Sequence, residues 1–193
     1  TGTILDLEEI AKICKQHSVY FHSDTVQSVG KMELDLQQIP VDFMVASAHK
    51  FHGPKGVGFA FIRKGLSLKP IFHGGEQEKG IRPGTESLHN IVGMAKALQV
   101  SYQNLDAERN CIQELKEYTI SQLQNKFPDM AFNGATQKTL YTILNVRLPL
   151  DASKSGTLLF NLDMKGIAVS RGSACQSGSA RPSHVLAAFL AKE

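Results

Sequence analysis

The chain has 193 residues, of which 42% are hydrophobic and 20% charged, which is enough for one large hydrophobic core or two small ones. Its formal net charge is only +3 with acids and bases interspersed, so nothing in the charge pattern favours binding to nucleic acid or to an anionic membrane. No apolar run approaches the roughly 20 residues of a membrane span, and the first residues do not resemble a signal peptide.

The three cysteines are Cys14, Cys111 and Cys175. Their odd number, wide spacing and lack of a C-x-x-C pair argue against a disulfide framework and against a structural zinc site. We therefore expect no metal and a cytoplasmic location. The chain starts at Thr1 and stops at Glu193 within an apparent helix, so we expect it to be a piece of a longer protein.

The first elements predicted along the chain are a helix and three strands. Asp6 can cap a helix whose apolar positions follow helical spacing. Three β-rich runs follow, at 19–22, 41–46 and 57–62, and polar residues come directly after the first two. Open α/β sheets bind ligands at the carboxyl ends of their strands, so we expect an α/β fold with a site at that edge.

The second half of the chain is predicted to be mainly helical and then mixed. A glycine-rich polar loop at 73–84 precedes a long helical stretch that begins at Thr85 and runs to about Phe127, with a break near Asn104. We place a domain boundary at this break, which gives domains 1–104 and 105–193. The second domain is expected to be a small α+β domain, with elements at 139–148 (strand), 155–164 (helix) and 167–170 (strand).

Lys50 lies in the run Ser47-Ala48-His49-Lys50, just after the second predicted strand. A lysine there can form a Schiff base with a carbonyl cofactor if burial and nearby positive charge keep its amine partly neutral. Ser47 and His49 could bind a phosphate group. The alternative is that Lys50 is an ordinary solvated charge in a loop.

Three further residues could complete a cofactor site. Asp24 could keep a pyridinium nitrogen protonated, which lets pyridoxal phosphate act as an electron sink, and Gln27 could donate to the phenolic oxygen of that cofactor. Thr85 ends the glycine-rich loop at an expected helix N-terminus, a natural anion site. The alternative for Asp24 is the commoner role of a helix cap or turn residue.

Three stretches, 22–28, 47–56 and 82–86, resemble in order and separation the cofactor motifs of cysteine desulfurases, which belong to the class V aminotransferase family. The resemblance implies the type I fold of pyridoxal-phosphate-dependent transferases. Residues 1–104 would then be the C-terminal half of a large cofactor-binding domain with a mainly parallel sheet. Residues 105–193 would be the small C-terminal α+β domain, truncated at its end.

The resemblance also assigns roles to individual residues. The implied cofactor-binding residues are Asp24, Gln27, Ser47, His49, Lys50 and Thr85. Lys50 would be the Schiff-base lysine, with Asp24 at the pyridine nitrogen and Gln27 at the phenolic oxygen. Ser47 and His49 would bind the cofactor phosphate. Thr85 would reach the phosphate of the neighbouring subunit's cofactor, which implies a homodimer.

Cys175 lies in a run of small residues, 170–180. A free cysteine is usually a buried small hydrophobe, and we expect this for Cys14 and Cys111, which lie on predicted amphipathic helices. A zinc ligand would need a second cysteine or histidine at ligand spacing. A nucleophile on a flexible loop fits the glycine and serine content best, with Arg171 available to favour the thiolate.

The same run resembles the active loop of the desulfurase branch with a longer, mobile cysteine loop. The implied reaction moves the sulfur of L-cysteine to Cys175 as a persulfide and releases alanine. A sulfur-acceptor or scaffold protein for iron–sulfur cluster or thio-cofactor synthesis would take the sulfur onward. A selenocysteine lyase, an aminotransferase of the same fold or a non-catalytic scaffold remain alternatives. Cofactor-stacking and substrate-binding residues of the family are expected outside this chain, so we expect the chain alone to be inactive.

Overall fold

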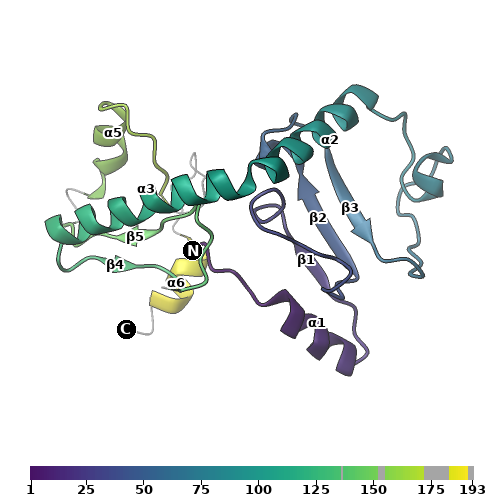
Figure 1. The fold of residues 1–193 in the computed structure, drawn as a ribbon, viewed down its shortest axis with the longest axis horizontal. Coiled ribbons are helices and arrows are strands. Elements are labelled where there is room, and N and C mark those ends of the chain that lie inside the picture. Colours follow the sequence, from purple (N-terminus) through teal and green to yellow (C-terminus); the bar gives the residue numbers. More distant parts are fainter. Residues whose placement is uncertain (136, 152–154, 172–182, 191–193) are drawn as a thin grey trace. The chain divides into compact units, whose positions relative to one another are not determined.

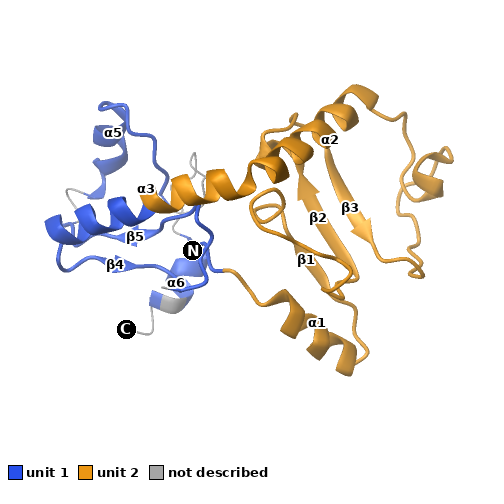
Figure 2. Cartoon of the chain, in the orientation of Figure 1, with its two compact units in different colours: residues 1–3, 116–193 blue, residues 4–115 orange. Residues whose placement is uncertain are grey.

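The computed structural model describes residues 1–193 except 136, 152–154, 172–182 and 191–193 (Figure 1). Its elements are α1 (Leu7–Gln16), β1 (His22–Asp24), β2 (Phe43–Ser47), the 3₁₀ helix η1 (Ala48–Phe51), β3 (Gly58–Ile62), the 3₁₀ turn η2 (Gln77–Gly80), α2 (Leu88–Gln103), α3 (Leu105–Lys126), β4 (Ala131–Phe132), β5 (Val146–Arg147), α5 (Leu158–Asp163) and α6 (His184–Leu190). They form two compact units, 4–115 and 1–3 with 116–193 (Figure 2). No helix in the described part of the chain is long and apolar enough to span a membrane.

The unit of residues 4–115 is built on a three-stranded sheet in the order β1-β2-β3. β1 pairs with β2 in parallel, and β2 pairs with β3 antiparallel. Of these three strands, one pair is therefore parallel and one antiparallel, so the predicted predominance of parallel pairing is not found in this part of the sheet. The antiparallel pair arises because only residues 48–57 connect β2 to β3, too few for a parallel crossover.

The core of this unit lies on one face of the sheet. Met44 and Ala46 of β2 are buried, whereas Phe43 and Val45, which alternate with them along the strand, are half-buried on the other face. Phe59 and Phe61 of β3 pair with the two buried positions and pack into the same cluster. α2 contributes its side chains to this core: Met94, Ala97 and Leu98. The sheet is thus covered by α2 on the core face (Figure 1).

A tight turn after β1 joins the sheet to η1 and α2. Gly30 has a φ of +77°, and a Cβ built on it would lie 2.8 Å from Cβ of Phe51 and 3.3 Å from Cβ of Ser101. Ser101 Oγ donates to the Phe51 carbonyl at 3.3 Å, and Tyr102 Oη donates to the Met32 carbonyl at 3.4 Å. A residue without a side chain is required at position 30, because the turn, η1 and α2 meet there.

Arg63 fixes the connection that precedes β2. Its guanidinium donates to three backbone carbonyl oxygens at 2.7 to 3.1 Å, those of Leu36, Ile39 and Val41. It also lies 5.6 Å from the centre of the Phe61 ring, within the range of a cation–π contact. The side chain therefore satisfies carbonyl groups that have no place in the sheet.

The unit of residues 1–3 and 116–193 contains the short antiparallel pair β4-β5. Thr3 forms an isolated antiparallel bridge with Thr139, and the amide of Leu140 donates to the Gly2 carbonyl at 2.8 Å. Lys116 is half-buried and donates to Thr139 Oγ1 and to the Leu140 carbonyl, each at 3.0 Å. Burial lowers the pKa of Lys116 below its ordinary value of 10.5.

The helix predicted to follow Asp6 is confirmed as α1. Asp6 caps it, because its side chain accepts a hydrogen bond from the amide of Glu9 at 3.2 Å. The break near Asn104 is confirmed too, between α2 and α3. The compact units divide inside α3, after Leu115, whereas the predicted domain boundary lies at 104/105 and stays a prediction.

Four element predictions are wrong. The first strand is not 19–22 but β1, which includes Asp24. The long helical stretch begins at Leu88 with Ser87 as N-cap, so Thr85 lies three residues before the helix. Only 146–147 of the predicted strand 139–148 is a strand, because the amide of Ile143 closes a turn onto the Leu140 carbonyl. Residues 167–170 form no strand, since no described residue pairs with them.

Candidate functional site

The candidate site lies where the parallel strands β1 and β2 end. Asp24 is the last residue of β1 and pairs with Val45, two residues before Ser47 at the end of β2. Parallel strands present their carboxyl ends at one edge of a sheet. Asp24, Ser47 and the η1 residues that follow are therefore at the same edge, as the sequence predicts.

Lys50 is half-buried on η1, the turn that directly follows β2. The turn is closed by the amide of Ala48, which donates to the Val57 carbonyl at 3.0 Å, and by the amide of Gly53, which donates to the Ala48 carbonyl at 2.8 Å. The neighbouring Phe51 is only 1% exposed and anchors the turn in the core. The backbone of Lys50 is thus fixed on both sides.

Ser47 and His49 contact each other. The distance between Ser47 Oγ and His49 Nδ1 is 2.9 Å, so this pair shares one hydrogen bond. The His49 side chain is exposed, and the contact orients its ring with Nε2 free of this bond. A hydroxyl and an imidazole held together beside a lysine can bind a phosphate group.

Asp24 is exposed, and its Oδ1 accepts from the amide of Val26 at 3.0 Å. This is the turn role that the sequence leaves open as the alternative. The role uses one carboxylate oxygen, so it leaves the other available to a ligand. The next residue, Thr25, is 1% exposed and donates from Oγ1 to the Val45 carbonyl at 2.8 Å, which ties the end of β1 to β2.

Gln27 is exposed on the turn that follows Asp24, and Lys31 lies next to it. Lys31 Nζ donates to Gln27 Oε1 at 3.4 Å. Burial lowers the pKa of Lys31, the nearby charge of Lys50 lowers it further, and Glu108 raises it. Lys31 therefore belongs to the site. Lys31 is missing from the residues predicted from the sequence, although its i,i+4 spacing from Gln27 is a usable signal.

The remaining predicted residues are Thr85 and Cys175. Thr85 is exposed in the stretch before α2, and it makes no hydrogen bond with the other predicted residues that the structure describes. Its expected position at a helix N-terminus is wrong, because the helix starts later. Cys175 lies outside the described residues.

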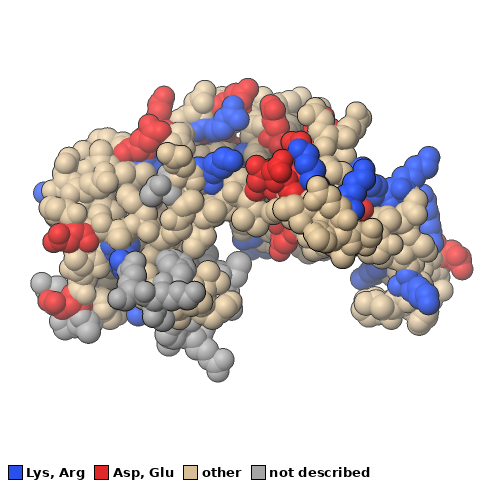
Figure 3. Space-filling model, turned by 90° about the horizontal axis from the view of Figure 1, so that it is seen from below, with Lys and Arg blue, Asp and Glu red and all other residues tan. Residues whose placement is uncertain are grey.

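The other two cysteines are free, Cys14 half-buried on α1 and Cys111 exposed on α3. The expectation that both are buried is thus wrong for Cys111 and only partly met for Cys14; Leu115 and Tyr118, on the same helix as Cys111, are also mostly exposed. Within the described ranges, no group of three or more His, Cys, Asp or Glu side chains is arranged to hold a metal. Acidic and basic side chains are intermixed over the face in Figure 3.

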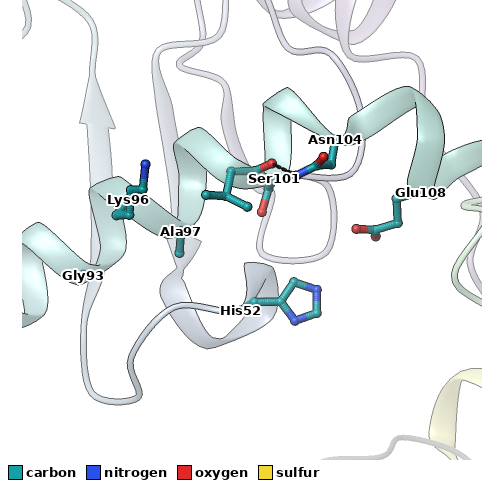
Figure 4. Close-up of a pocket in the computed structure, with 8 residues that line it drawn as sticks. His52, Gly93, Lys96, Ala97, Ser101, Asn104 and Glu108 are labelled. Carbon is teal, nitrogen blue, oxygen red and sulfur yellow. Dashed lines mark hydrogen bonds between the residues drawn. The ribbon is translucent and has the colours of Figure 1, made fainter.

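A cavity of about 440 Å³ lies beside η1, between His52 and the end of α2 (Figure 4). In the close-up, the His52 ring lies below α2 and the Glu108 carboxylate points toward the same space. The cavity is lined by His52, Gly93, Lys96, Ala97, Val100, Ser101, Asn104 and Glu108. None of the predicted cofactor residues lines it, so the cavity and the site at the strand ends are different places.

Comparisons with known proteins agree on one family. The sequence model described as aminotransferase class-V matches residues 1–190. The cysteine desulfurase IscS of Dictyoglomus turgidum is 41% identical over 188 residues, which cover 97% of this chain and 47% of that protein. The chain thus spans about half the length of the curated relatives it matches.

Two solved structures are similar as well. A "NifS-like protein" has a TM-score of 0.79 at 37% identity, covering 88% of this chain and 46% of its own. A structure described as "SspA in complex with cysteine" has a TM-score of 0.72 at 29% identity, covering 97% of this chain and 51% of its own.

Proposed function

Because this chain belongs to the class V aminotransferase family and has the type I fold, we propose that the whole protein is a pyridoxal-phosphate-dependent cysteine desulfurase. One observation carries the proposal. A half-buried lysine, Lys50, follows β2 beside the paired Ser47 and His49, and the carboxylate of Asp24 ends the neighbouring parallel strand. The names of the relatives support the desulfurase reaction over the others in the family.

The donor groups of the site fit this cofactor. Its aldehyde needs an amine, its phosphate needs hydroxyl and cationic or imidazole donors, and its ring nitrogen needs a carboxylate. Lys50, the Ser47–His49 pair and the free oxygen of Asp24 supply these groups at one sheet edge. Lys31 adds a second positive charge near Lys50, which suits an anionic ligand.

Each residue then has a definite task. Lys50 would hold the cofactor covalently and, once released by the substrate amine, would carry protons between substrate positions. Asp24 would keep the ring nitrogen protonated, Gln27 would donate to the phenolic oxygen, and Ser47 with His49 would hold the phosphate. When bound, the cofactor supplies an electron sink for bonds at the substrate's α-carbon.

The sulfur transfer would be carried out by Cys175. Its thiolate attacks the sulfur of L-cysteine, so a sulfur–sulfur bond forms and the substrate carbon–sulfur bond breaks. The electron pair of the broken bond stays on the carbon side, where a proton completes alanine. The solved relative described in complex with cysteine supports an amino acid substrate of this size. Arg171, exposed four residues before Cys175, is available to favour the thiolate.

We also propose that the enzyme is a cytoplasmic homodimer in which Thr85 reaches the neighbouring subunit's cofactor. Four large apolar side chains between the end of β3 and the second turn of α2 are more than 60% exposed: Ile71, Phe72, Leu88 and Val92. Exposed apolar side chains of this size are what a subunit interface would cover. The persulfide sulfur would pass to an acceptor or scaffold protein, for iron–sulfur clusters or thio-cofactors.

The test compares two cysteine substitutions in the whole protein. Cys175→Ser is expected to lower sulfide and alanine production from L-cysteine by about a thousandfold or more, with the visible absorption of the bound cofactor retained. Cys111→Ser, the matched control at an exposed cysteine, is expected to change neither. Lys50→Ala should abolish the covalently bound cofactor.

The alternatives give different results. Unchanged turnover in Cys175→Ser would favour a selenocysteine lyase or an aminotransferase. An unmutated protein without visible absorption would favour a non-catalytic scaffold. The chain of residues 1–193 alone is expected to release no sulfide, and sulfide release by it would contradict the role assigned to residues outside it.

A further inference from the structure

We infer that Lys31 is a positioning residue of the cofactor site: it holds the side-chain oxygen of Gln27 and so leaves the Gln27 amide NH₂ to face the cofactor. The inference deepens the proposed function and rests on it. Lys31 lies just after the stretch 22–28 that carries Asp24 and Gln27.

The contact itself fixes which end of the amide faces Lys31. Lys31 Nζ lies 3.4 Å from Gln27 Oε1. A lysine ammonium has three donors and no acceptor, so only the oxygen of an amide can face it favourably. The NH₂ group of Gln27 is then on the side away from Lys31. An NH₂ group is what the phenolic oxygen of the cofactor needs, because that oxygen is an acceptor when ionised.

Lys31 is well placed to hold this orientation because its own backbone is fixed. Its amide donates to the Ser28 carbonyl at 3.0 Å, and the preceding Gly30 is packed against Phe51 and Ser101. Phe51 directly follows Lys50, so the close approach of Gly30 to Phe51 brings the backbones of the two lysines near each other. The Lys31 side chain is half-buried, which limits the conformations open to its ammonium.

The charges around Lys31 agree with this placement. The positive charge of Lys50 on η1 lowers the pKa of Lys31, and the carboxylate of Glu108 on α3 opposes it. Lys31 therefore lies within electrostatic range of both. Its removal would act on the cofactor in two ways, through Gln27 and through loss of a positive charge near Lys50. The experiment has to separate these two routes.

The readout is the pH midpoint at which the visible absorption of the bound cofactor changes, measured in the whole protein. A donor to the phenolic oxygen stabilises its ionised form, so loss of that donor raises the midpoint. Gln27→Leu and Lys31→Met are each expected to raise it by about half to one pH unit. Lys64→Met, at an exposed lysine of the same unit, is the matched control and should leave it unchanged.

The double variant decides between the routes. If Lys31 acts through Gln27, then Lys31→Met should shift the midpoint less than half as much in the Gln27→Leu background as in the unmutated protein. Lys31→Arg, which also presents only donors, should restore the midpoint to within about 0.2 units. Circular dichroism of each variant reports whether it is folded.

Fully additive shifts, or no shift in Lys31→Met, would overturn the inference while leaving the proposed function intact. If Lys31→Met does not fold, Lys31→Arg still tests the inference. A shift of the pH midpoint in the arginine variant as large as that in Gln27→Leu would also overturn the inference. Absence of visible absorption in the unmutated protein would instead overturn the proposed function, and this inference with it.

Discussion

Replacement of Gly30 by alanine is expected to destabilise the protein strongly, because two separate costs fall on one position. The residue has a φ of +77°, where an L side chain costs about 1–2 kcal/mol. The added Cβ would also lie 2.8 Å from Cβ of Phe51, which is 1% exposed and cannot move aside freely. Overpacking of this kind costs about 1–3 kcal/mol, so the sum is about 2–5 kcal/mol.

Gly65→Ala is the control that isolates the steric part. Gly65 also has a positive φ, +96°, but a Cβ built on it meets nothing within 4 Å. Gly65→Ala should therefore lower the unfolding free energy only by the cost of placing an L residue at positive φ, about 1–2 kcal/mol. The assay is denaturant unfolding followed by far-ultraviolet circular dichroism, since the chain contains no tryptophan to report on unfolding.

The comparison has a clear refuting outcome. Equal losses of unfolding free energy in Gly30→Ala and Gly65→Ala would show that the contact between the turn and Phe51 is not tight in solution. In that case Gly30 would not set the position of Lys31 relative to Lys50. A loss at Gly30 that exceeds the loss at Gly65 by about 1 kcal/mol or more supports the packing described above.

Two further substitutions test other contacts. Arg63→Met removes a donor to three backbone carbonyl groups and is expected to lower the unfolding free energy by about 2–4 kcal/mol. Lys64→Met, at the neighbouring residue, is the control and should have almost no effect on the unfolding free energy. Equal effects of the two substitutions would contradict the role of Arg63. Burial lowers the pKa of Lys116 from 10.5, so the unfolded chain holds this proton more tightly and stability should rise with pH between the lowered pKa and 10.5. Lys116→Met should flatten this rise in unfolding free energy, and an unchanged pH dependence would refute the assignment.

The sequence predicts the sheet edge well because the physical signals there are local. β-rich runs followed at once by polar residues mark where β1 and β2 end, and Lys50 is indeed on the turn after β2. The capping of α1 by Asp6 and the break at Asn104 are also set by near neighbours in the chain. Such features need no knowledge of distant contacts.

The sequence-based predictions fail where contacts between residues far apart in the chain determine the local structure. Residues 139–148 have strand-like composition, yet Leu140 and Tyr141 are buried in a turn because the Leu140 amide pairs with Gly2. Lys31 is an unremarkable lysine in the sequence, and only the packing of Gly30 against Phe51 brings it near Lys50. The roles given to Asp24, Gln27, Ser47, His49, Lys50, Thr85 and Cys175 remain predictions.

The short loop that connects the antiparallel strands β2 and β3 also affects the order in which the candidate site forms during folding. Ser47 pairs with Gly58, so Lys50 sits in a loop of residues 48–57 whose ends meet within one hairpin. A loop of about ten residues closes in roughly 10–100 ns, and such local pairing adds little to the contact order. Asp24 joins β2 only through the longer parallel crossover that leads back to Phe43. We therefore expect the loop that carries Lys50 to form early in folding, and the strand that ends at Asp24 to pair with β2 later.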